Sequence, residues 1–332
     1  MKIGVVGAGS WGTALAAHLS RAGHDVVLWA REAEIVAGIR SLHRNPLFLG
    51  DADLPESLVA TAEIDAAVAG AEAVVFVVPV QHARAVLREI GARLGADAAL
   101  VSASKGIEVA TLDRMDEIAT AELRLPIGRF VALSGPSFAR EVVAGMPTAA
   151  VLAGSDEERL RAIQTAFSTP AFRFYTAADV IGVELAGALK NVVALAAGMA
   201  SGLGLGHNAV AALLTRGLHE ITRLGVRLGG RAETFRGLAG MGDLVLTCTG
   251  ELSRNRAAGE RLGRGEPLAA IVAGREVAEG VPTTSAAAAL ARRHEVDMPL
   301  TFAIEAILAG RLAPADAVWE LMRRELKAEA AL

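Results

Sequence analysis

Hydrophobic positions in the first half of the chain come in short β-branched runs that alternate with longer stretches of helical periodicity. This alternation is typical of a parallel sheet in which a helix crosses over between successive strands. It predicts strands over residues 3–6, 25–29, 73–78, 98–103, 130–134, 148–152 and 172–175, with helices over 11–21, 82–94 and 156–167. The stretch 43–55 carries Pro46, Gly50 and Pro55 and predicts an irregular segment.

The second half of the chain lacks such runs and shows helical periodicity from about Asp179 onward. Helices are predicted over residues 180–201, 208–228, 253–262, 268–272, 284–293, 301–309 and 314–321, with a turn-rich piece over 235–250. We therefore expect two domains, residues 1–178 with an α/β fold and residues 179–332 with an all-helical fold.

A glycine-rich turn, Gly7-Ala8-Gly9-Ser10-Trp11-Gly12, joins the first predicted strand to the first predicted helix. In a strand–turn–helix unit, Gly7 permits the tight turn, Gly9 lets the backbone approach a pyrophosphate, and Gly12 allows close packing of helix on strand. The helix N-terminus presents N–H groups and a positive dipole end to the phosphates. The pattern predicts a Rossmann-like doubly wound sheet that binds a nicotinamide dinucleotide.

The end of the second predicted strand bears on which nicotinamide is used. A site for NAD usually places an acid there, to hold the ribose 2′-hydroxyl. Here the strand runs out through Trp29 and Ala30 into Arg31, with no acid before Glu32. A guanidinium pairs well with a 2′-phosphate. We expect NADP(H) to be preferred and NAD(H) tolerated, with a solvated surface arginine as the alternative.

Lys190 stands out in the second half because its helical neighbours are small and apolar. Between residues 180 and 206 the only charged side chains are Glu184 and Lys190. Burial disfavours the charged form of a lysine and lowers its pKa, which suits it to donate and accept protons. Asn191 follows directly and is placed to orient a substrate oxygen. The alternative is a lysine paired with a distant carboxylate for structural reasons.

Further polar groups follow predicted strands or begin predicted helices. Lys105 and the Gly135-Pro136-Ser137 turn come after strands, at the edge where doubly wound sheets place ligands. Asp243 lies in Gly240-Met241-Gly242-Asp243, which is predicted to be a loop because it is too glycine-rich for a helix. Ser253-Arg254-Asn255 combines three phosphate-binding groups before a helix. Each feature alone is more often structural. Together they predict a small anionic substrate.

Composition excludes several classes of function. The formal net charge is −4 and the pI about 6.0, which does not favour nucleic acid or an anionic membrane as a partner. One cysteine rules out an internal disulfide, and the seven histidines show no metal-ligand spacing. The most membrane-like stretch, residues 185–205, is interrupted by Lys190 and Asn191 and predicts a buried core helix. We expect no secretory leader, no bound metal and a cytoplasmic location.

Taken together, these segments closely resemble the bacterial NAD(P)-dependent glycerol-3-phosphate dehydrogenases. The matching stretches run in the family's order along nearly the whole chain: GAGSWGTALA at 7–16, SASKGIE at 102–108, LSGPSFARE at 133–141, ELAGALKNVVALAAG at 184–198, GLAGMGDLVLTCTG at 237–250 and SRNRAAGERLG at 253–263. The resemblance implies a Rossmann-like domain followed by a helical one, an active site between them, and supply of glycerol 3-phosphate for phospholipid synthesis.

The resemblance also implies roles for individual residues. Lys190 would be the proton acceptor in glycerol 3-phosphate oxidation, and Thr247 a hydroxyl close to the substrate. The implied substrate contacts are Lys105, Gly135, Ser137, Lys190, Asn191, Asp243, Ser253, Arg254 and Asn255. The implied cofactor contacts are Gly7, Gly9, Ser10, Trp11, Gly12, Arg31, Lys105, Ala139, Arg254, Val277 and Glu279.

One departure from the family pattern concerns the segment Asn-Pro-x-Tyr-Leu-Pro, which reads Asn45-Pro46-Leu47-Phe48-Leu49-Gly50 here. Phe48 keeps an aromatic ring but loses the phenol hydroxyl. Two alternatives remain open: a ketopantoate reductase or β-hydroxyacid dehydrogenase of the same two-domain plan, and a non-catalytic NADP-binding regulator. The apolar C-terminal helices suggest a homodimer.

Overall fold

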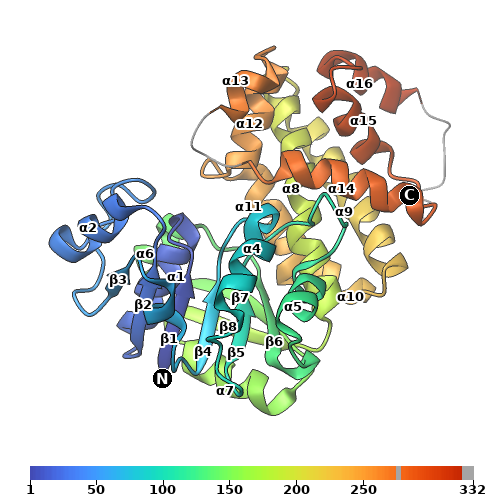
Figure 1. The fold of residues 1–332 in the computed structure, drawn as a ribbon. Helices are drawn as coiled ribbons and strands as arrows, with labels where there is room; N and C mark the ends of the chain where they lie inside the picture. Colours follow the sequence, from blue (N-terminus) through green and yellow to red (C-terminus); the bar gives the residue numbers. More distant parts are fainter. Residues whose placement is uncertain (274–277, 324–332) are drawn as a thin grey trace. The chain divides into compact units, whose positions relative to one another are not determined.

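The computed structural model describes residues 1–273 and 278–323. The chain divides into two compact units, each coherent in itself (Figure 1). The first unit combines Met1–Ser104 with Met115–Val180, and the second combines Lys105–Arg114 with the chain from Ile181 onward. The main division thus falls at Val180, beside the expected position of 178. The predicted single boundary did not include the assignment of residues 105–114 to the second unit.

The first unit is built on one eight-stranded sheet with the order β3-β2-β1-β4-β5-β6-β7-β8. Its strands are β1 (Lys2–Val6), β2 (Asp25–Trp29), β3 (Val59–Thr61), β4 (Ala73–Phe76), β5 (Ala99–Ser102), β6 (Phe130–Ser134), β7 (Thr148–Ala153) and β8 (Phe172–Ala177). The order reverses at β1, which pairs with β2 on one side and β4 on the other. In doubly wound sheets this reversal marks the ligand-binding edge.

Two features of the sheet differ from the sequence prediction. Strand β3 was missed because three residues carry too short a pattern to recognise. The sheet is also mixed, since β7 runs antiparallel to β6 while β8 runs parallel to β7. The connection from β6 to β7 contains only the five-residue helix α6 (Ala139–Val143), which is too short to carry the chain back along a strand for a parallel crossover.

Helices cover the sheet of the first unit, and their apolar faces fill its core. They are α1 (Ser10–Arg21), α2 (Ala33–Leu42), α3 (Ile64–Val68), α4 (Val80–Gly91), α5 (Met115–Leu123), α6 and α7 (Glu157–Phe167). Helix α1 packs against α6, and α4 packs against α5. Alanine and leucine side chains of α1 are fully buried against β-branched residues of β1 and β2. This packing fixes the turn between β1 and α1.

The second unit is helical within the described residues, as predicted. Its helices are α8 (Val180–Gly202), α9 (His207–Arg227), α10 (Ala232–Arg236), α11 (Asp243–Thr249), α12 (Arg254–Gly263), α13 (Leu268–Val272), α14 (Gly280–Arg293), α15 (Pro299–Leu308) and α16 (Pro314–Met322). The stretch 235–250 is more ordered than the expected turn-rich piece. A π-helical turn, Leu238–Gly242, leads directly into α11.

Helix α8 forms the centre of the second core. It is the one described helix that is long and apolar enough to cross a membrane, yet 83% of its most apolar window is buried inside the protein. Its residues pack with α9, α12 and α14 around the second hydrophobic core. The burial supports its interpretation as a core helix.

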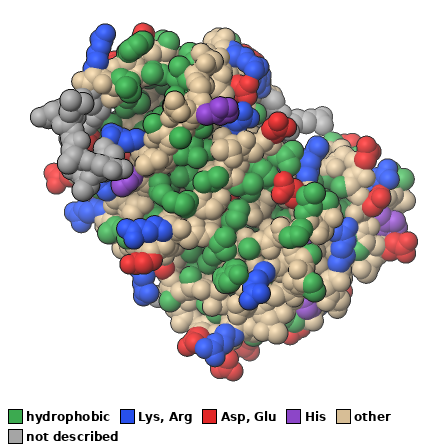
Figure 2. Space-filling model, turned by 180° about the vertical axis from the view of Figure 1, so that it is seen from behind, with side chains coloured by type: hydrophobic (Ala, Val, Ile, Leu, Met, Phe, Trp, Pro, Cys, Tyr) green, Lys and Arg blue, Asp and Glu red, His purple; other side chains and the backbone are tan. Residues whose placement is uncertain are grey.

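Charged side chains of both signs are interspersed on the surface seen from behind (Figure 2). Basic and acidic groups lie close to one another on that face, in keeping with a formal net charge of only −4. The described residues on this face therefore form no extended basic patch of the kind that binds a phosphate backbone.

Candidate active site

The structure explains why glycine stands at each of the three positions of the first turn, and the reason differs among them. Gly7 has a φ of +111°, and a Cβ there would lie 2.6 Å from the Val77 carbonyl oxygen. A Cβ on Gly12 would lie 1.8 Å from the Gly7 carbonyl oxygen. The fold itself therefore requires both glycines. Gly9 differs, because a Cβ there would meet no atom of residues 1–273 and 278–323 within 4 Å.

The surroundings of the turn suit a dinucleotide pyrophosphate. Helix α1 begins with Gly9 as its N-cap, has no side-chain cap and carries no acidic residue in its first turn, so its N-terminal N–H groups face no competing anion of its own. The indole Nε1 of Trp11 is buried without a hydrogen-bond partner among the residues that the structure describes. The open space at Gly9 and this orphaned donor fit a bound ligand.

Arg31 follows β2 beside the turn, because the Gly7 N–H donates to the Trp29 carbonyl oxygen at 3.2 Å. Its side chain is 78% exposed and pairs with the Glu32 carboxylate, with Nη2 3.0 Å from Oε1. The guanidinium is therefore accessible at the edge where the sequence predicts the ribose 2′-position. The acid at Glu32 is accessible at the same place.

In the second unit, the structure brings Lys190, Lys105 and Asp243 together. Lys190 lies in the middle of α8 and is 5% exposed. Its Nζ donates to Asp243 Oδ1 and, at 2.7 Å, to Thr247 Oγ1. The Nζ of Lys105 donates to the other carboxylate oxygen of Asp243 at 2.7 Å. One buried carboxylate thus bridges two lysines.

Helix α11 presents both partners of Lys190. Asp243 is its first residue and Thr247 lies one turn later, so their side chains share a face. The π-helical turn before it packs closely: a Cβ on Gly240 would lie 2.1 Å from the Phe235 carbonyl oxygen. The prediction that Asp243 lies in a loop was wrong, because the glycines here permit close packing of a helical turn and do not break it.

The electrostatics of the cluster follow from burial. Burial lowers the pKa of Lys190 to about 8; the Asp243 carboxylate opposes this shift and the Lys105 ammonium adds to it. Burial alone would raise the pKa of Asp243, but the two lysines hold it below its ordinary value. Lys190 therefore changes protonation state near neutral pH beside a carboxylate that stays charged.

A second chain of contacts connects Asn191, Asn255 and Gly280. The Asn255 Nδ2 donates to Asn191 Oδ1 at 2.9 Å, and its Oδ1 accepts from the Gly280 N–H at 2.9 Å. The carboxamide of Asn255 therefore ties helices α8, α12 and α14 together. Ser253 is the N-cap of α12 and accepts from the Arg256 N–H at 3.2 Å, while Arg254 at the start of the helix is exposed.

Glu279 precedes α14 and lies within electrostatic range of Arg254, Lys105 and Lys190. Burial raises its pKa, against the lowering effect of these three cations. Val277, another predicted cofactor contact, lies outside the described residues. Cys248 is buried on α11, and burial raises the pKa of its thiol to about 12, so it is not a nucleophile at neutral pH.

The remaining predicted contacts belong to the first unit. Gly135 has a φ of +138°, and a Cβ there would lie 2.9 Å from the Ala150 Cα. The hydroxyl of Ser137 donates to the Gly135 carbonyl oxygen at 2.9 Å, and Ala139 opens α6. These residues form one compact turn after β6, as the sequence predicts.

Thr247 was predicted only through the family resemblance, and no role was predicted for Asn45. Asn45 is fully buried and hydrogen bonded to the glycine turn. The sequence signals at Asn45 were an Asn-Pro pair in a segment predicted to be irregular and its place in the family segment 45–50. No group of three or more His, Cys, Asp and Glu side chains within residues 1–273 and 278–323 is arranged to hold a metal ion.

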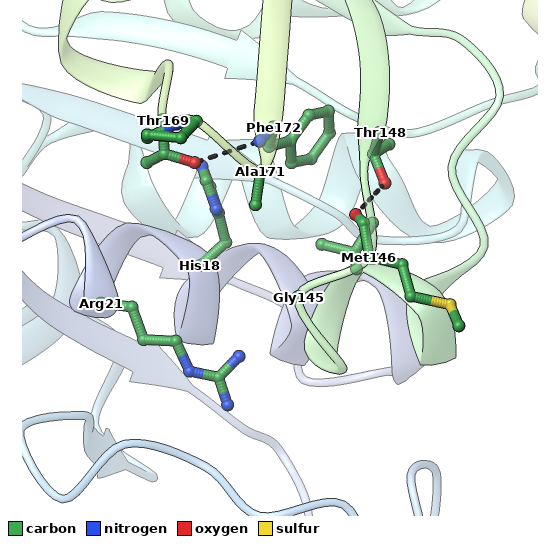
Figure 3. A pocket seen from close by; sticks show the side chains of 10 residues that line it. His18, Arg21, Gly145, Met146, Thr148, Thr169, Ala171 and Phe172 are labelled. Carbon is green, nitrogen blue, oxygen red and sulfur yellow. Dashed lines mark hydrogen bonds between the residues drawn. The ribbon is translucent and has the colours of Figure 1, made fainter.

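A separate cavity of about 240 Å³ lies in the first unit and contains none of the predicted site residues (Figure 3). Its lining includes His18 and Arg21 of α1, Met146, Thr148 and Phe172. The two hydroxyls that face it, those of Thr148 and Thr169, already bond to backbone groups. Burial lowers the pKa of His18, whose Nε2 lies 2.7 Å from the Phe167 carbonyl oxygen.

Family models match both halves of the chain. One, described as the NAD-dependent glycerol-3-phosphate dehydrogenase N-terminus, matches residues 2–160, and the corresponding C-terminus matches residues 179–319. The chain belongs to this family. It is accordingly an oxidoreductase that uses a nicotinamide dinucleotide.

Individual relatives match this chain over nearly its full length. Glycerol-3-phosphate dehydrogenase [NAD(P)+] of Nitratidesulfovibrio vulgaris (strain DP4) is 53% identical over 99% of this chain and the whole of that protein. The crystal structure of glycerol-3-phosphate dehydrogenase from Coxiella burnetii is 40% identical, with a TM-score of 0.92 over 97% of this chain and 98% of that chain. A ketopantoate reductase from Ralstonia eutropha JMP134, at 16% identity and a TM-score of 0.58 over 96% of this chain and all of that chain, shares the fold alone.

Proposed function

We propose that this enzyme interconverts dihydroxyacetone phosphate and sn-glycerol 3-phosphate, with NADP(H) preferred and NAD(H) also used. The observation that carries the proposal is the buried lysine Lys190, held by Asp243 and Thr247 with a pKa of about 8. A ketone reduction needs a proton donor that is charged at neutral pH and has a pKa close enough to neutral to release its proton, and this lysine meets that need.

Lys190 is the general acid and base of the proposed reaction. The nicotinamide, when bound, supplies the hydride that the carbonyl carbon of the substrate accepts. An ammonium group has three donors, and two of those on Lys190 point to Asp243 and Thr247. The third serves the substrate oxygen, which takes its proton as the alkoxide forms. Lys105 adds positive potential at the developing negative charge.

The phosphate of the substrate is assigned to the start of α12. Arg254 is exposed there, and α12 carries no acid in its first turn. A guanidinium and a helix N-terminus are both favourable partners of a phosphate. We assign the other substrate contacts to Lys105, Gly135, Ser137, Asn191, Asp243, Ser253 and Asn255.

The cofactor is assigned to the glycine turn. The open space at Gly9 and the orphaned Nε1 of Trp11 support this assignment. We assign the ribose 2′-phosphate to Arg31, an assignment that the exposure of its guanidinium supports. The complete proposed set is Gly7, Gly9, Ser10, Trp11, Gly12, Arg31, Lys105, Ala139, Arg254, Val277 and Glu279.

The deciding experiment is the rate of NADPH oxidation with dihydroxyacetone phosphate, measured for Lys190→Ala. A positioned general acid contributes about 10²–10⁴-fold to rate, so kcat is expected to fall by that factor with little change in NADPH affinity. Lys2→Ala is the control, since the Lys2 ammonium donates to the Ala69 carbonyl oxygen on the surface. Near-normal turnover of Lys190→Ala would remove the lysine from this role.

The alternatives give different results in the same assay. A ketopantoate reductase or β-hydroxyacid dehydrogenase would not require a phosphate, so equal turnover of unphosphorylated dihydroxyacetone would overturn the phosphate assignment. A non-catalytic NADP-binding regulator would bind NADPH without oxidising it. The buried Lys190 cluster favours the dehydrogenase, because a regulator has no use for a titrating lysine in a core helix.

We further propose a cytoplasmic homodimer that supplies glycerol 3-phosphate for phospholipid synthesis. Support for self-association comes from α16, where Trp319 is 63% and Met322 is 74% exposed. Large exposed apolar side chains are common at protein interfaces. Light scattering would give twice the chain mass for a dimer and the chain mass for a monomer.

A further inference from the structure

Asn45 is completely buried, yet it lies in the irregular segment between α2 and β3. Its Nδ2 donates to the Ala8 carbonyl oxygen at 2.9 Å and to Thr13 Oγ1 at 2.8 Å. The Thr13 hydroxyl donates in turn to the same Ala8 oxygen at 3.2 Å. Two side-chain donors therefore converge on one carbonyl of the glycine turn.

This anchoring fixes the orientation of the peptide between Ala8 and Gly9. In a trans peptide the carbonyl and the following N–H point in opposite directions. Because the Ala8 oxygen points inward to Asn45 and Thr13, the Gly9 N–H must point away from them. Among the described residues no acceptor is found for that N–H.

The open space at Gly9 leaves its N–H free to donate to a ligand outside the turn. A Cβ on Gly9 would meet no protein atom within 4 Å, whereas one on Gly7 or Gly12 would collide with backbone. Of the three glycines of the turn, Gly9 alone leaves room for a ligand in the part of the chain that the structure describes. An unpaired N–H at a helix N-cap, facing open space, is a favourable partner for a phosphate oxygen.

The segment around Asn45 is itself held in place. The Asn45 Oδ1 accepts from the Phe48 N–H at 3.2 Å, and the Phe48 carbonyl oxygen accepts from Ser10 Oγ at 3.0 Å. Arg44 pairs with Asp53 on the surface, with Nη2 2.9 Å from Oδ1. Both links from Phe48 use its backbone, so the missing phenol of this aromatic residue does not affect them.

We propose that Asn45 is a positioning residue for the dinucleotide: it aims the Gly9 N–H at the pyrophosphate. The inference rests on cofactor binding at the glycine turn and adds a residue outside the contact set. An amide is required because the Asn45 Nδ2 donates to two acceptors, the Ala8 carbonyl oxygen and Thr13 Oγ1. A carboxylate of the same shape has no donor for them and is itself an anion.

The test compares two probes on Asn45→Asp. ADP-ribose carries the pyrophosphate, and adenosine 2′-monophosphate lacks it. Loss of one well-placed hydrogen bond to a charged group weakens binding about 10-fold or more, so the dissociation constant of ADP-ribose is expected to rise by that factor. The dissociation constant of adenosine 2′-monophosphate should stay within about twofold, because its binding does not use Gly9.

The kinetic readout separates positioning from general damage. The KM for NADPH and NADH should rise together, while kcat and the KM for dihydroxyacetone phosphate stay near wild-type values. Asp53→Asn breaks the Arg44 pair in the same segment, and Ser20→Ala removes the Ser57 contact of α1; both should leave ADP-ribose binding unchanged. If Asn45→Asp does not fold, Thr13→Val removes one donor to Ala8 and should show a smaller loss with the same selectivity for ADP-ribose.

Two results would overturn the inference. One is wild-type affinity of a folded Asn45→Asp for ADP-ribose, and the other is an equal loss of affinity for both probes. Failure of the proposed reaction is distinguishable, because it would appear as a wild-type protein that binds ADP-ribose and does not reduce dihydroxyacetone phosphate.

Discussion

Arg31 and Glu32 form an ion pair at the carboxyl end of β2, with Arg31 Nη2 3.0 Å from Glu32 Oε1. The two side chains are the two groups that recognise the ribose 2′-position in dinucleotide sites: a guanidinium binds the 2′-phosphate of NADP, and a carboxylate binds the 2′-hydroxyl of NAD. Because they pair with each other, each competes with the ligand that the other would bind. This arrangement supports the proposed use of both NADP(H) and NAD(H).

Separating the pair is expected to shift the cofactor preference in opposite directions. Arg31→Gln should lower kcat/KM for NADPH by about 10- to 100-fold, since it removes a charge-assisted contact to the 2′-phosphate. Glu32→Gln should raise kcat/KM for NADPH by at most about fivefold, because an exposed ion pair contributes only about 1 kcal/mol. The same variant should reduce the use of NADH. Parallel changes with both cofactors would contradict this account.

The pH dependence of turnover should report Lys190, whose pKa is about 8. Ketone reduction needs the charged lysine, so its rate is expected to fall as the pH rises through about 8. Oxidation of glycerol 3-phosphate needs the neutral lysine, so its rate should rise through the same range. Initial rates at saturating cofactor in both directions would check the opposite signs.

Asp243→Asn should move both profiles to lower pH. The Asp243 carboxylate raises the pKa of Lys190, and removing its charge while keeping its shape leaves burial and Lys105 to lower that pKa further. A folded variant whose profiles keep their wild-type midpoints would show that another group titrates. Circular dichroism provides the check on folding.

Arg254→Ala is expected to raise the KM for dihydroxyacetone phosphate by about 10- to 100-fold, in line with loss of a charge-assisted contact to phosphate. Arg256→Ala is the matched control, because Arg256 lies on the same helix and faces Glu260, 3.8 Å away. Its KM should stay close to wild type. If both variants behave alike, the effect arises from α12 as a whole and not from a phosphate contact.

His18 should make the first unit less stable in mild acid. Burial lowers its pKa below the ordinary value of 6.5, so the unfolded chain takes up its proton first as the pH falls. Its contribution to stability is therefore complete above about pH 6.5 and is lost progressively below it. His18→Gln retains a donor for the Phe167 carbonyl oxygen. Urea midpoints should fall less steeply for this variant between about pH 7 and about pH 5, and parallel curves would contradict the prediction.

Much of the fold could be predicted from periodicity because the pattern of each element is local. Continuous apolar runs predict most strands of the sheet and helix α8, and the spacing of its glycines predicts the glycine turn. Strand β3 and the reversed direction of β7 could not be predicted in this way. The first is too short to carry a pattern, and the second depends on the path of a connection, which apolar spacing does not encode.

By itself, the sequence determined the dinucleotide turn, the isolation of Lys190 in an apolar helix and the resemblance to a dehydrogenase family. Each depends on residues that are neighbours along the chain or one helical turn apart. Only the tertiary structure decided that Asp243 bridges Lys105 and Lys190, and that Asn45 anchors the carbonyl of Ala8. These contacts join residues 37 to 138 positions apart, and the packing of helices and loops, which no local pattern specifies, brings them within hydrogen-bonding distance.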